Sequence, residues 1–267
     1  MRLRIRHRTL YRYDRPVERG VQLVRLFPRP HAGLDLLRWK VSGGNGPTTT
    51  PHEDGVGNLA ALMSLKPGAM TEDVLVEGEV ETRDMDGWLK SAPEALPPAY
   101  FQRDTERTLA NDAIRALSAE VVISADGLDR LSEIVRDRID FRAGETDSGT
   151  TAIEALARGA GVCQDHAHVL IAAARAAGLP ARYVSGYFWP GEMEEAASHA
   201  WVEIYLEEQG WLGLDPANRC RAGEAYVRVA VGLDYAQAAP ITGVRYGGGA
   251  ERLTIDVSVK PAARLQQ

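Results

Sequence analysis

Residues 161–180 read GVCQDHAHVLIAAARAAGLP and combine one cysteine with the pattern of a buried helix. Apolar residues recur there at helical spacing, namely Ala167, Leu170, Ile171 and Ala174. Gly178 and Pro180 follow and are residues that commonly end a helix. Cys163 lies at the start of the predicted helix, where backbone N–H groups and the helix dipole stabilise an anion. The segment therefore predicts a helix whose first turn favours a thiolate at Cys163.

Two later segments place a histidine and an aspartate on predicted neighbouring strands. In 198–206, SHAWVEIYL, the alternate residues Ala200, Val202, Ile204 and Leu206 share an apolar face. His199 lies on the opposite face. In 210–216, GWLGLDP, the same alternation sets Asp215 apart from the two leucines. If a hairpin pairs Leu206 with Gly210, His199 and Asp215 become diagonal neighbours about 7–8 Å apart at Cα, within reach of a hydrogen bond.

Together, the three residues predict an activated nucleophile. The thiol of Cys163 would attack, His199 would act as general base and acid, and Asp215 would hold the imidazole in one tautomer. Trp201 and Tyr205 share the strand face of His199, and with Gln164 they are candidate substrate-binding residues. For the two aromatic residues a role in sheet packing stays open.

The same region also allows a metal cluster as an alternative. Its members would be Cys163, Asp165, His166, His168 and His199. Their spacing matches no familiar zinc motif, and residues at i and i+2 of a helix do not face the same way. No calcium-loop pattern is present either. We therefore expect no metal and no cofactor.

The flanking sequence predicts two domains. Short alternating strands with Pro- and Gly-containing turns fill the first part and predict a small β-sandwich over 1–86. A Pro-rich stretch predicts a linker over 87–104. The rest, 105–267, is expected to form an α+β core, because predicted helices are followed by predicted antiparallel strands. The helices are expected at 105–120, 127–139, 151–159 and in the segment that follows Cys163; the strands include 181–189 and 252–259.

The first predicted strand carries a row of arginines at every second position: Arg2, Arg4, Arg6 and Arg8. We interpret this row as the solvated face of an edge strand, whose charges discourage aggregation. The alternative is a basic surface for an acidic partner. A partner or a second copy that binds through the N-terminal domain therefore remains open.

Bulk properties restrict the function class. The net charge of −6 and the pI near 5.6 argue against binding to nucleic acid. No apolar run is long enough to cross a bilayer, and the basic N-terminus lacks the apolar stretch of a signal peptide. Cys163 and Cys220 are the two cysteines, too few for a disulfide framework, which favours a cytoplasmic location.

The three motifs resemble those of bacterial transglutaminase-like proteins, a superfamily with a papain-like core. The resemblance is carried by residues 161–188, 198–206 and 210–218, and it extends to 11–30, 54–58 and 231–248, which resemble one bacterial branch with an N-terminal β-sandwich. It implies a papain-like α+β core with Cys163 as nucleophile, His199 as base and acid, and Asp215 as the orienting carboxylate.

The resemblance also implies thiol-dependent acyl transfer on amide bonds through a thioester. Hydrolysis of peptide or isopeptide-like amides is the expected outcome, with a peptide or protein as substrate. An amine acceptor in place of water would make the protein a cross-linking transglutaminase, and a non-catalytic binding module on the same fold is a further alternative.

Overall fold

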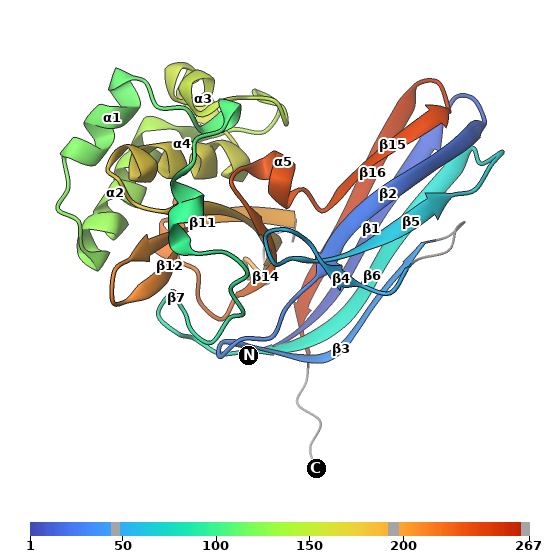
Figure 1. The fold of residues 1–267 in the computed structure, drawn as a ribbon, viewed down its shortest axis with the longest axis horizontal. Coiled ribbons are helices and arrows are strands. Elements are labelled where there is room, and N and C mark those ends of the chain that lie inside the picture. Colours follow the sequence, from blue (N-terminus) through green and yellow to red (C-terminus); the bar gives the residue numbers. More distant parts are fainter. Residues whose placement is uncertain (44–48, 192–197, 263–267) are drawn as a thin grey trace, which may run out of the picture.

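The computed structural model describes residues 1–43, 49–191 and 198–262 of the chain. Figure 1 shows two bodies side by side, a helix-covered domain and an elongated β-sandwich. The sandwich is made of two four-stranded antiparallel sheets, and the other domain packs helices on a six-stranded sheet. This α+β architecture agrees with the predicted fold class.

The two sheets of the sandwich contain strands from both ends of the chain. The first sheet has the order β16 (Glu251–Pro261), β1 (Arg2–Tyr13), β6 (Thr71–Thr82) and β3 (Leu34–Gly43). The second has the order β15 (Ile241–Gly247), β2 (Val17–Phe27), β5 (Leu59–Leu65) and β4 (His52–Glu53). Between the sheets lies an apolar cluster that includes Val24, Leu26, Ala61, Met63, Val74 and Val76.

The arginine row lies on a central strand, so the prediction of an edge strand is wrong. β1 is paired along its length with β6 on one side and β16 on the other. Leu3 and Ile5 point into the core, and the alternate arginines point outward. Two of them, Arg2 and Arg4, form ion pairs with Glu79 of β6 at 2.8 and 2.7 Å. The row is thus matched by acidic residues across the sheet.

The predicted core boundary also needs correction, because residues 241–261 belong to the sandwich. The strand expected at 252–259 forms as part of β16, but it pairs with β1 instead of extending the sheet of the core. The alternation of apolar and polar residues indicates that a segment is a strand and which face it buries. It does not indicate which distant strand will be the partner.

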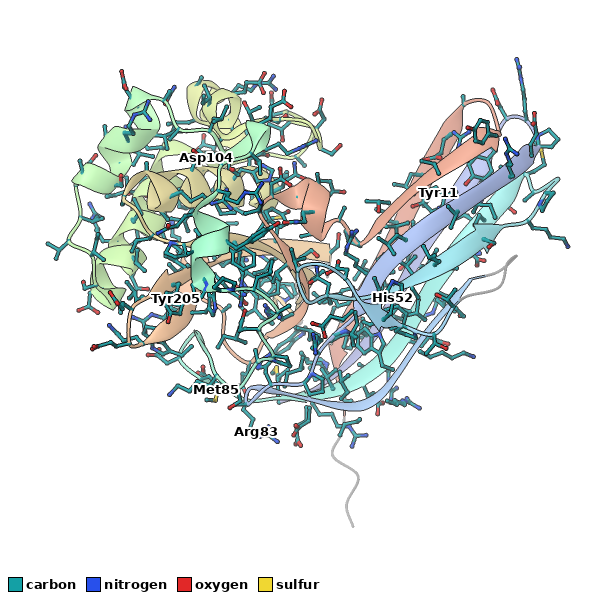
Figure 2. The ribbon with its side chains drawn as sticks, viewed as in Figure 1. Tyr11, His52, Arg83, Met85, Asp104 and Tyr205 are labelled. Atoms are coloured by element: carbon teal, nitrogen blue, oxygen red, sulfur yellow. The ribbon has the colours of Figure 1, made fainter. Side chains whose placement is uncertain are left out.

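The expected linker over 87–104 packs against the core instead of spanning free space. β7 (Trp88–Leu89) pairs with a strand of the core sheet, and the 3-10 helix η1 (Pro98–Gln102) buries Phe101. Glu94 forms an ion pair at 2.7 Å with Arg182, a buried residue of the core sheet. Arg83 and Met85 lie where the chain leaves the sandwich, at the base shared by the two bodies (Figure 2).

The core domain is built around a central helix on the sheet. The sheet has the order β13 (Cys220–Arg221), β12 (Gly210–Asp215), β11 (Ser198–Leu206), β10 (Ala181–Phe188) and β14 (Tyr226–Gly232), with β7 added beside β12. The helices are α1 (Asp112–Ala119), α2 (Ala125–Arg138), α3 (Ala152–Arg158), α4 (Cys163–Ala176) and α5 (Tyr235–Ala238). The short elements are η2 (Glu106–Thr108), β8 (Asp140–Phe141) and β9 (Ala160–Gly161). α4 is the buried helix that the sequence predicts.

One predicted helix is shorter than expected. The segment 105–120 begins with the 3-10 turn η2, and α1 starts only at Asp112. The reason is local: the Asn111 side chain accepts a hydrogen bond from the backbone of Ile114, which is how a helix N-cap is made. The other helices start and end within a few residues of their predicted bounds.

Candidate active site

Cys163 is the first residue of α4, and the turn around it is fixed by Asp165. The buried Asp165 carboxylate accepts hydrogen bonds from the backbone N–H of Val162 at 2.7 Å and from the Thr146 hydroxyl at 2.6 Å. A side chain at Gly161 would place its Cβ 2.5 Å from that carboxylate, so glycine is required there. The start of the helix, and with it the thiol, is therefore held in one place.

The histidine and the aspartate meet as the hairpin register predicts. Leu206 pairs with Gly210, and His199 Nε2 donates to Asp215 Oδ2 at 2.6 Å. The His199 side chain also forms a hydrogen bond with Cys163. Since Nε2 faces the carboxylate, Nδ1 is the ring nitrogen left for the thiol. The structure thus brings Cys163, His199 and Asp215 into one chain of contacts.

The electrostatics of the contacts among Cys163, His199 and Asp215 favour a charged imidazole. Burial by itself would lower the pKa of His199, but the hydrogen bonds and charges of Asp215 and Cys163 outweigh it and raise the pKa to about 10. Asp215 is fully buried, which disfavours its charge, yet its hydrogen bonds to His199, Asn218 and Tyr226 lower its pKa. At neutral pH the arrangement therefore favours an imidazolium next to Cys163 and an ionised carboxylate on its other side.

Two residues of this site are not among those predicted from the sequence. Asn218 Nδ2 and Tyr226 Oη each donate to Asp215 Oδ2, both at 2.7 Å. Asn218 also donates its backbone N–H to Oδ1 at 3.2 Å. An Asn three residues after an Asp in a turn is a detectable signal, because an Asp side chain often accepts from a nearby backbone N–H. Tyr226 gives no such signal, since it comes from a different strand.

The three candidate substrate-binding residues lie in different places. Gln164 follows Cys163 directly, is partly exposed, and donates to the Asp147 carbonyl at 3.3 Å. Trp201 is buried, with its ring 6.4 Å from that of His199. Tyr205 lies four residues further along β11 and packs edge-on against Trp211. The structure therefore brings Gln164 and Trp201 to the site and leaves Tyr205 at the far end of the strand.

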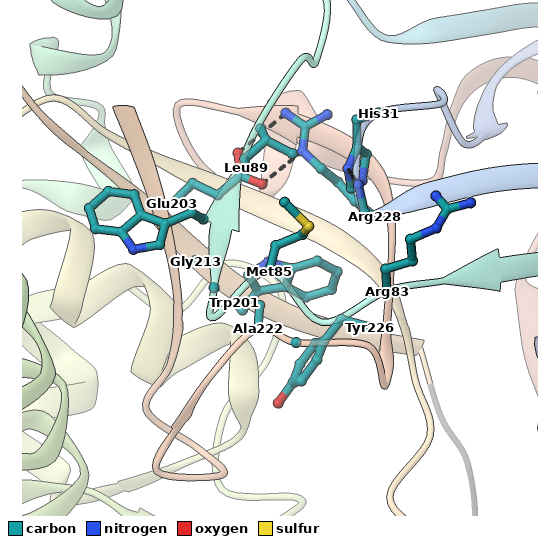
Figure 3. A pocket seen from close by; sticks show the side chains of 14 residues that line it. His31, Arg83, Met85, Leu89, Trp201, Glu203, Gly213, Ala222, Tyr226 and Arg228 are labelled. Atoms are coloured by element: carbon teal, nitrogen blue, oxygen red, sulfur yellow. Dashed lines mark hydrogen bonds and ion pairs between the residues drawn. The ribbon is translucent and has the colours of Figure 1, made fainter. Parts of the chain in front are cut away.

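Trp201 lies next to the histidine on the same face of the sheet. Any side chain at Gly186 would come within 2.6 Å of the Trp201 ring and 2.2 Å of the Val227 carbonyl. Beside Trp201 is a small pocket of about 40 Å³, which is also lined by Tyr226 and by Met85, just before the linker (Figure 3). The Trp201 ring is thus packed from several sides.

The two histidines of α4 point to different elements, as their spacing predicts. The ring nitrogens of His166 lie 2.8 Å from the Val162 carbonyl and 2.9 Å from the Ile139 carbonyl. His168 Nε2 accepts from the backbone N–H of Tyr235. Within residues 1–43, 49–191 and 198–262, no three His, Cys, Asp or Glu side chains are grouped so that they could hold a metal ion. In the same ranges no helix is long and apolar enough to cross a membrane.

The chain is similar to known proteins along nearly its whole length. Proteins of uncharacterised function from Mycobacterium bovis and Mycobacterium leprae are 30% and 27% identical; each alignment covers 97% of this chain, and 91% and 98% of the relative. A solved structure from Cytophaga hutchinsonii, described as a candidate cysteine protease, superposes with a TM-score of 0.78 at 19% identity, covering 100% of this chain and 92% of that one.

A third similarity is confined to part of the core. In an alignment 105 residues long that covers 33% of this chain, the sequence is 37% identical to a protein-glutamine gamma-glutamyltransferase from Pseudomonas aeruginosa. The match covers only 15% of that protein.

Fold and site together define a papain-like, transglutaminase-like protein with an N-terminal sheet domain. The family described as the transglutaminase-like superfamily matches residues 107–216, and the bacterial transglutaminase-like N-terminal region matches residues 3–81. The chain belongs to the transglutaminase-like superfamily and carries that bacterial N-terminal region.

Proposed function

We propose that the protein is a cysteine peptidase or amidase that hydrolyses peptide or isopeptide-like amides through a thioester on Cys163. The observation that carries this proposal is the continuous chain of contacts from Cys163 at the start of α4, through His199, to the buried carboxylate of Asp215. Each member is in the position that nucleophilic catalysis requires: a thiol, a base beside it, and a group that orients the base.

The acylation step uses the thiol proton. His199 already holds the proton of Cys163 as an imidazolium, and the thiolate attacks the amide carbonyl carbon, so that a C–S bond forms and the carbonyl oxygen becomes an oxyanion. Backbone N–H groups in the first turn of α4 are donors suited to that oxyanion. When the intermediate collapses, the C–N bond breaks, His199 returns its proton to the leaving amine, and a thioester remains.

The deacylation step reverses these roles. Neutral His199 takes a proton from a water molecule, and the hydroxide oxygen attacks the thioester carbon. The C–S bond then breaks, which releases a carboxylic acid and restores the thiolate beside the protonated His199. If a primary amine attacks in place of water, the product is a new amide. The partial similarity to a protein-glutamine gamma-glutamyltransferase supports this amine acceptor as the second candidate.

The test is the pH dependence of Cys163 alkylation by iodoacetamide in a Cys220→Ser background. Serine is chosen because Cys220 Sγ lies 3.2 Å from the Tyr226 hydroxyl, and a serine keeps a donor there. We expect rapid labelling well below pH 8, because an imidazolium stabilises the thiolate. In His199→Ala this labelling should collapse. Ordinary thiol behaviour in both proteins would favour the non-catalytic module.

The acceptor is tested separately with a trapped acyl-enzyme. A peptide p-nitrophenyl ester acylates the thiol, and mass spectrometry follows loss of the acyl group with and without a lysine-like amine. Hydrolysis as the main route predicts free acid at an unchanged rate when 10 mM amine (on the order of ten times a usual millimolar KM) is added. Amide as the dominant product would replace the peptidase with a transglutaminase.

A further inference from the structure

The Asp215 carboxylate has an unusual set of donors on one oxygen. Oδ2 accepts from His199 Nε2 at 2.6 Å, from Asn218 Nδ2 at 2.7 Å and from Tyr226 Oη at 2.7 Å. A carboxylate that serves only to orient an imidazole needs one of these bonds. The two further donors to the same oxygen, Asn218 and Tyr226, therefore need a separate explanation.

Tyr226 is held in place independently of the carboxylate. It is the first residue of β14, opposite Phe188 of β10, and it is buried. Its ring packs 4.6 Å from the Phe188 ring and 5.3 Å from Trp201. The hydroxyl is thus presented to Asp215 by a rigid aromatic cluster, and it does not depend on the ion pair for its position.

The direction of the Tyr226 hydrogen bond is fixed by the chemistry of its neighbours. An ionised Asp215 only accepts, so the tyrosine O–H must donate to it. Cys220 Sγ lies 3.2 Å from the same hydroxyl and can then only donate its S–H to the tyrosine oxygen. The result is a relay from Cys220 through Tyr226 to Asp215.

We infer that Tyr226 is a positioning residue that holds the Asp215 carboxylate and shares its negative charge with His199. The inference rests on the proposed function, because it assigns a role within the same site. A donor on Oδ2 spreads the charge of that oxygen, which weakens its attraction for the imidazolium. His199 then gives its proton back to the leaving amine more readily than it would beside an unshared carboxylate.

The ionisable groups around this relay come from several elements. Facing Asp215 and Tyr226 are His199 of β11 and Cys220 of β13, with Cys163 of α4 next to His199, and on the same sheet face lie Glu203 of β11 and Arg228 of β14. Glu203 and Arg228 form an ion pair with each other at 2.8 Å. Arg219 and Arg221, which line the surface near Cys220, are paired with Asp137 and Asp129.

The test compares Tyr226→Phe with Tyr187→Phe. Tyr187 is a matched control, because its buried hydroxyl is hydrogen-bonded to His7 at 2.9 Å, outside the site. The first measurement is the titration of His199 by NMR on histidine-labelled protein, with the resonance assigned by its absence in His199→Ala. The second is the kcat and KM for a peptide ester.

For Tyr226→Phe we expect His199 to titrate at higher pH than in the wild type. We also expect kcat to fall roughly tenfold, the size of one hydrogen bond to a charged group, with KM unchanged. Tyr187→Phe should change neither quantity. Asn218→Ala removes the other side-chain donor to Oδ2 and should shift the titration in the same direction, which keeps the test available if Tyr226→Phe folds poorly.

The inference is overturned if His199 titrates at the same or a lower pH in Tyr226→Phe or, where that variant folds poorly, in Asn218→Ala. This result is separable from failure of the proposed function. If Cys163 labelling is insensitive to His199→Ala, the catalytic pair itself is absent. If that labelling collapses as expected while Tyr226→Phe leaves the titration unchanged, only the role of Tyr226 is lost.

Discussion

Asp215 shows how a buried charge is kept in the folded chain. Its side chain is fully buried, and an isolated carboxylate in such a place would become protonated. Three side-chain donors and one backbone N–H remove that cost. The consequence is that the carboxylate stays ionised and can support a positive charge on His199.

Replacing Asp215 by Asn tests this at the residue scale. The amide keeps the shape but cannot balance an imidazolium, so the pKa of His199 should fall and kcat/KM should drop by about 10³ to 10⁴, as for the equivalent change in a serine triad. Asp86→Asn is the control, since Asp86 is an exposed ion-pair partner of Arg221. Steady-state kinetics and the His199 titration measure both effects. A loss below tenfold would show that Asp215 is not the orienting group.

Much of the site could be predicted at this scale, and the limit is physical. Cys163, His199 and Asp215 are revealed by a helix start and by strand alternation, both of which are local patterns. Tyr226 reaches Asp215 from β14, with β10 and β11 between that strand and β12 in the sheet. A contact that depends on the twist of several strands and on a side chain's reach leaves no periodic trace in the sequence.

At the scale of elements, the close packing of β10 against its neighbours depends on Gly186. The β10–β14 pair changes register between Ser185 and Gly186, and the Trp201 ring fills the space that a side chain would need. Gly186 lies opposite His199 in the β10–β11 pair, so the site and the bulge are neighbours. A shift of the backbone at Gly186 would therefore also displace His199.

We therefore expect Gly186→Ala to destabilise the fold. The new Cβ would lie 2.2 Å from the Val227 carbonyl, so the backbone must move, at a cost of about 1–3 kcal/mol in the free energy of unfolding. Gly55→Ala is the matched control, because a Cβ at that position would have no atom within 4 Å. Urea unfolding followed by tryptophan fluorescence compares the midpoints. Equal midpoints would mean that β10 and β14 adapt without strain.

Elements are easier to predict than their partners. The helices that start at Ala125, Ala152 and Cys163 and the strands of the hairpin follow from periodicity and capping residues. The sequence of β1 predicts an edge strand because its arginines resemble the charges that protect edges. The same charges also suit a central strand whose outer face meets acidic residues on a neighbour, and a single strand cannot distinguish the two cases.

At the scale of the whole molecule, both domains bury a neutral histidine. Burial lowers the pKa of His7 in the sandwich and of His168 in the core to about 4. In the unfolded chain both should titrate near 6.5. Above pH 6.5 neither state binds these protons, so the two histidines leave stability unchanged there. As the pH falls from 6.5 toward 4, the unfolded state gains protons that the folded state does not.

The free energy of unfolding should therefore decrease on acidification, by about 2 kcal/mol for each histidine at pH 5. Urea unfolding at several pH values between 5 and 6.5 measures the slope, because above 6.5 the raised pKa of His199 gives stability the opposite pH dependence. His168→Gln should reduce the slope by one histidine's share, whereas the exposed His52→Gln should leave it unchanged. A flat profile over this range would mean that the buried rings are protonated in the folded protein.

The position of β15 and β16 has a consequence for how the protein is made. β1, β2, β5 and β6 are synthesised first, yet β1 and β2 each lack one neighbour until Ile241–Pro261 has been added. At the usual speed of a ribosome, the roughly 160 residues between Thr82 and Ile241 take about ten to thirty seconds to translate. During that interval the two incomplete sheets can pair with neighbouring nascent chains. The whole core has to be synthesised before the last strands can complete the sandwich.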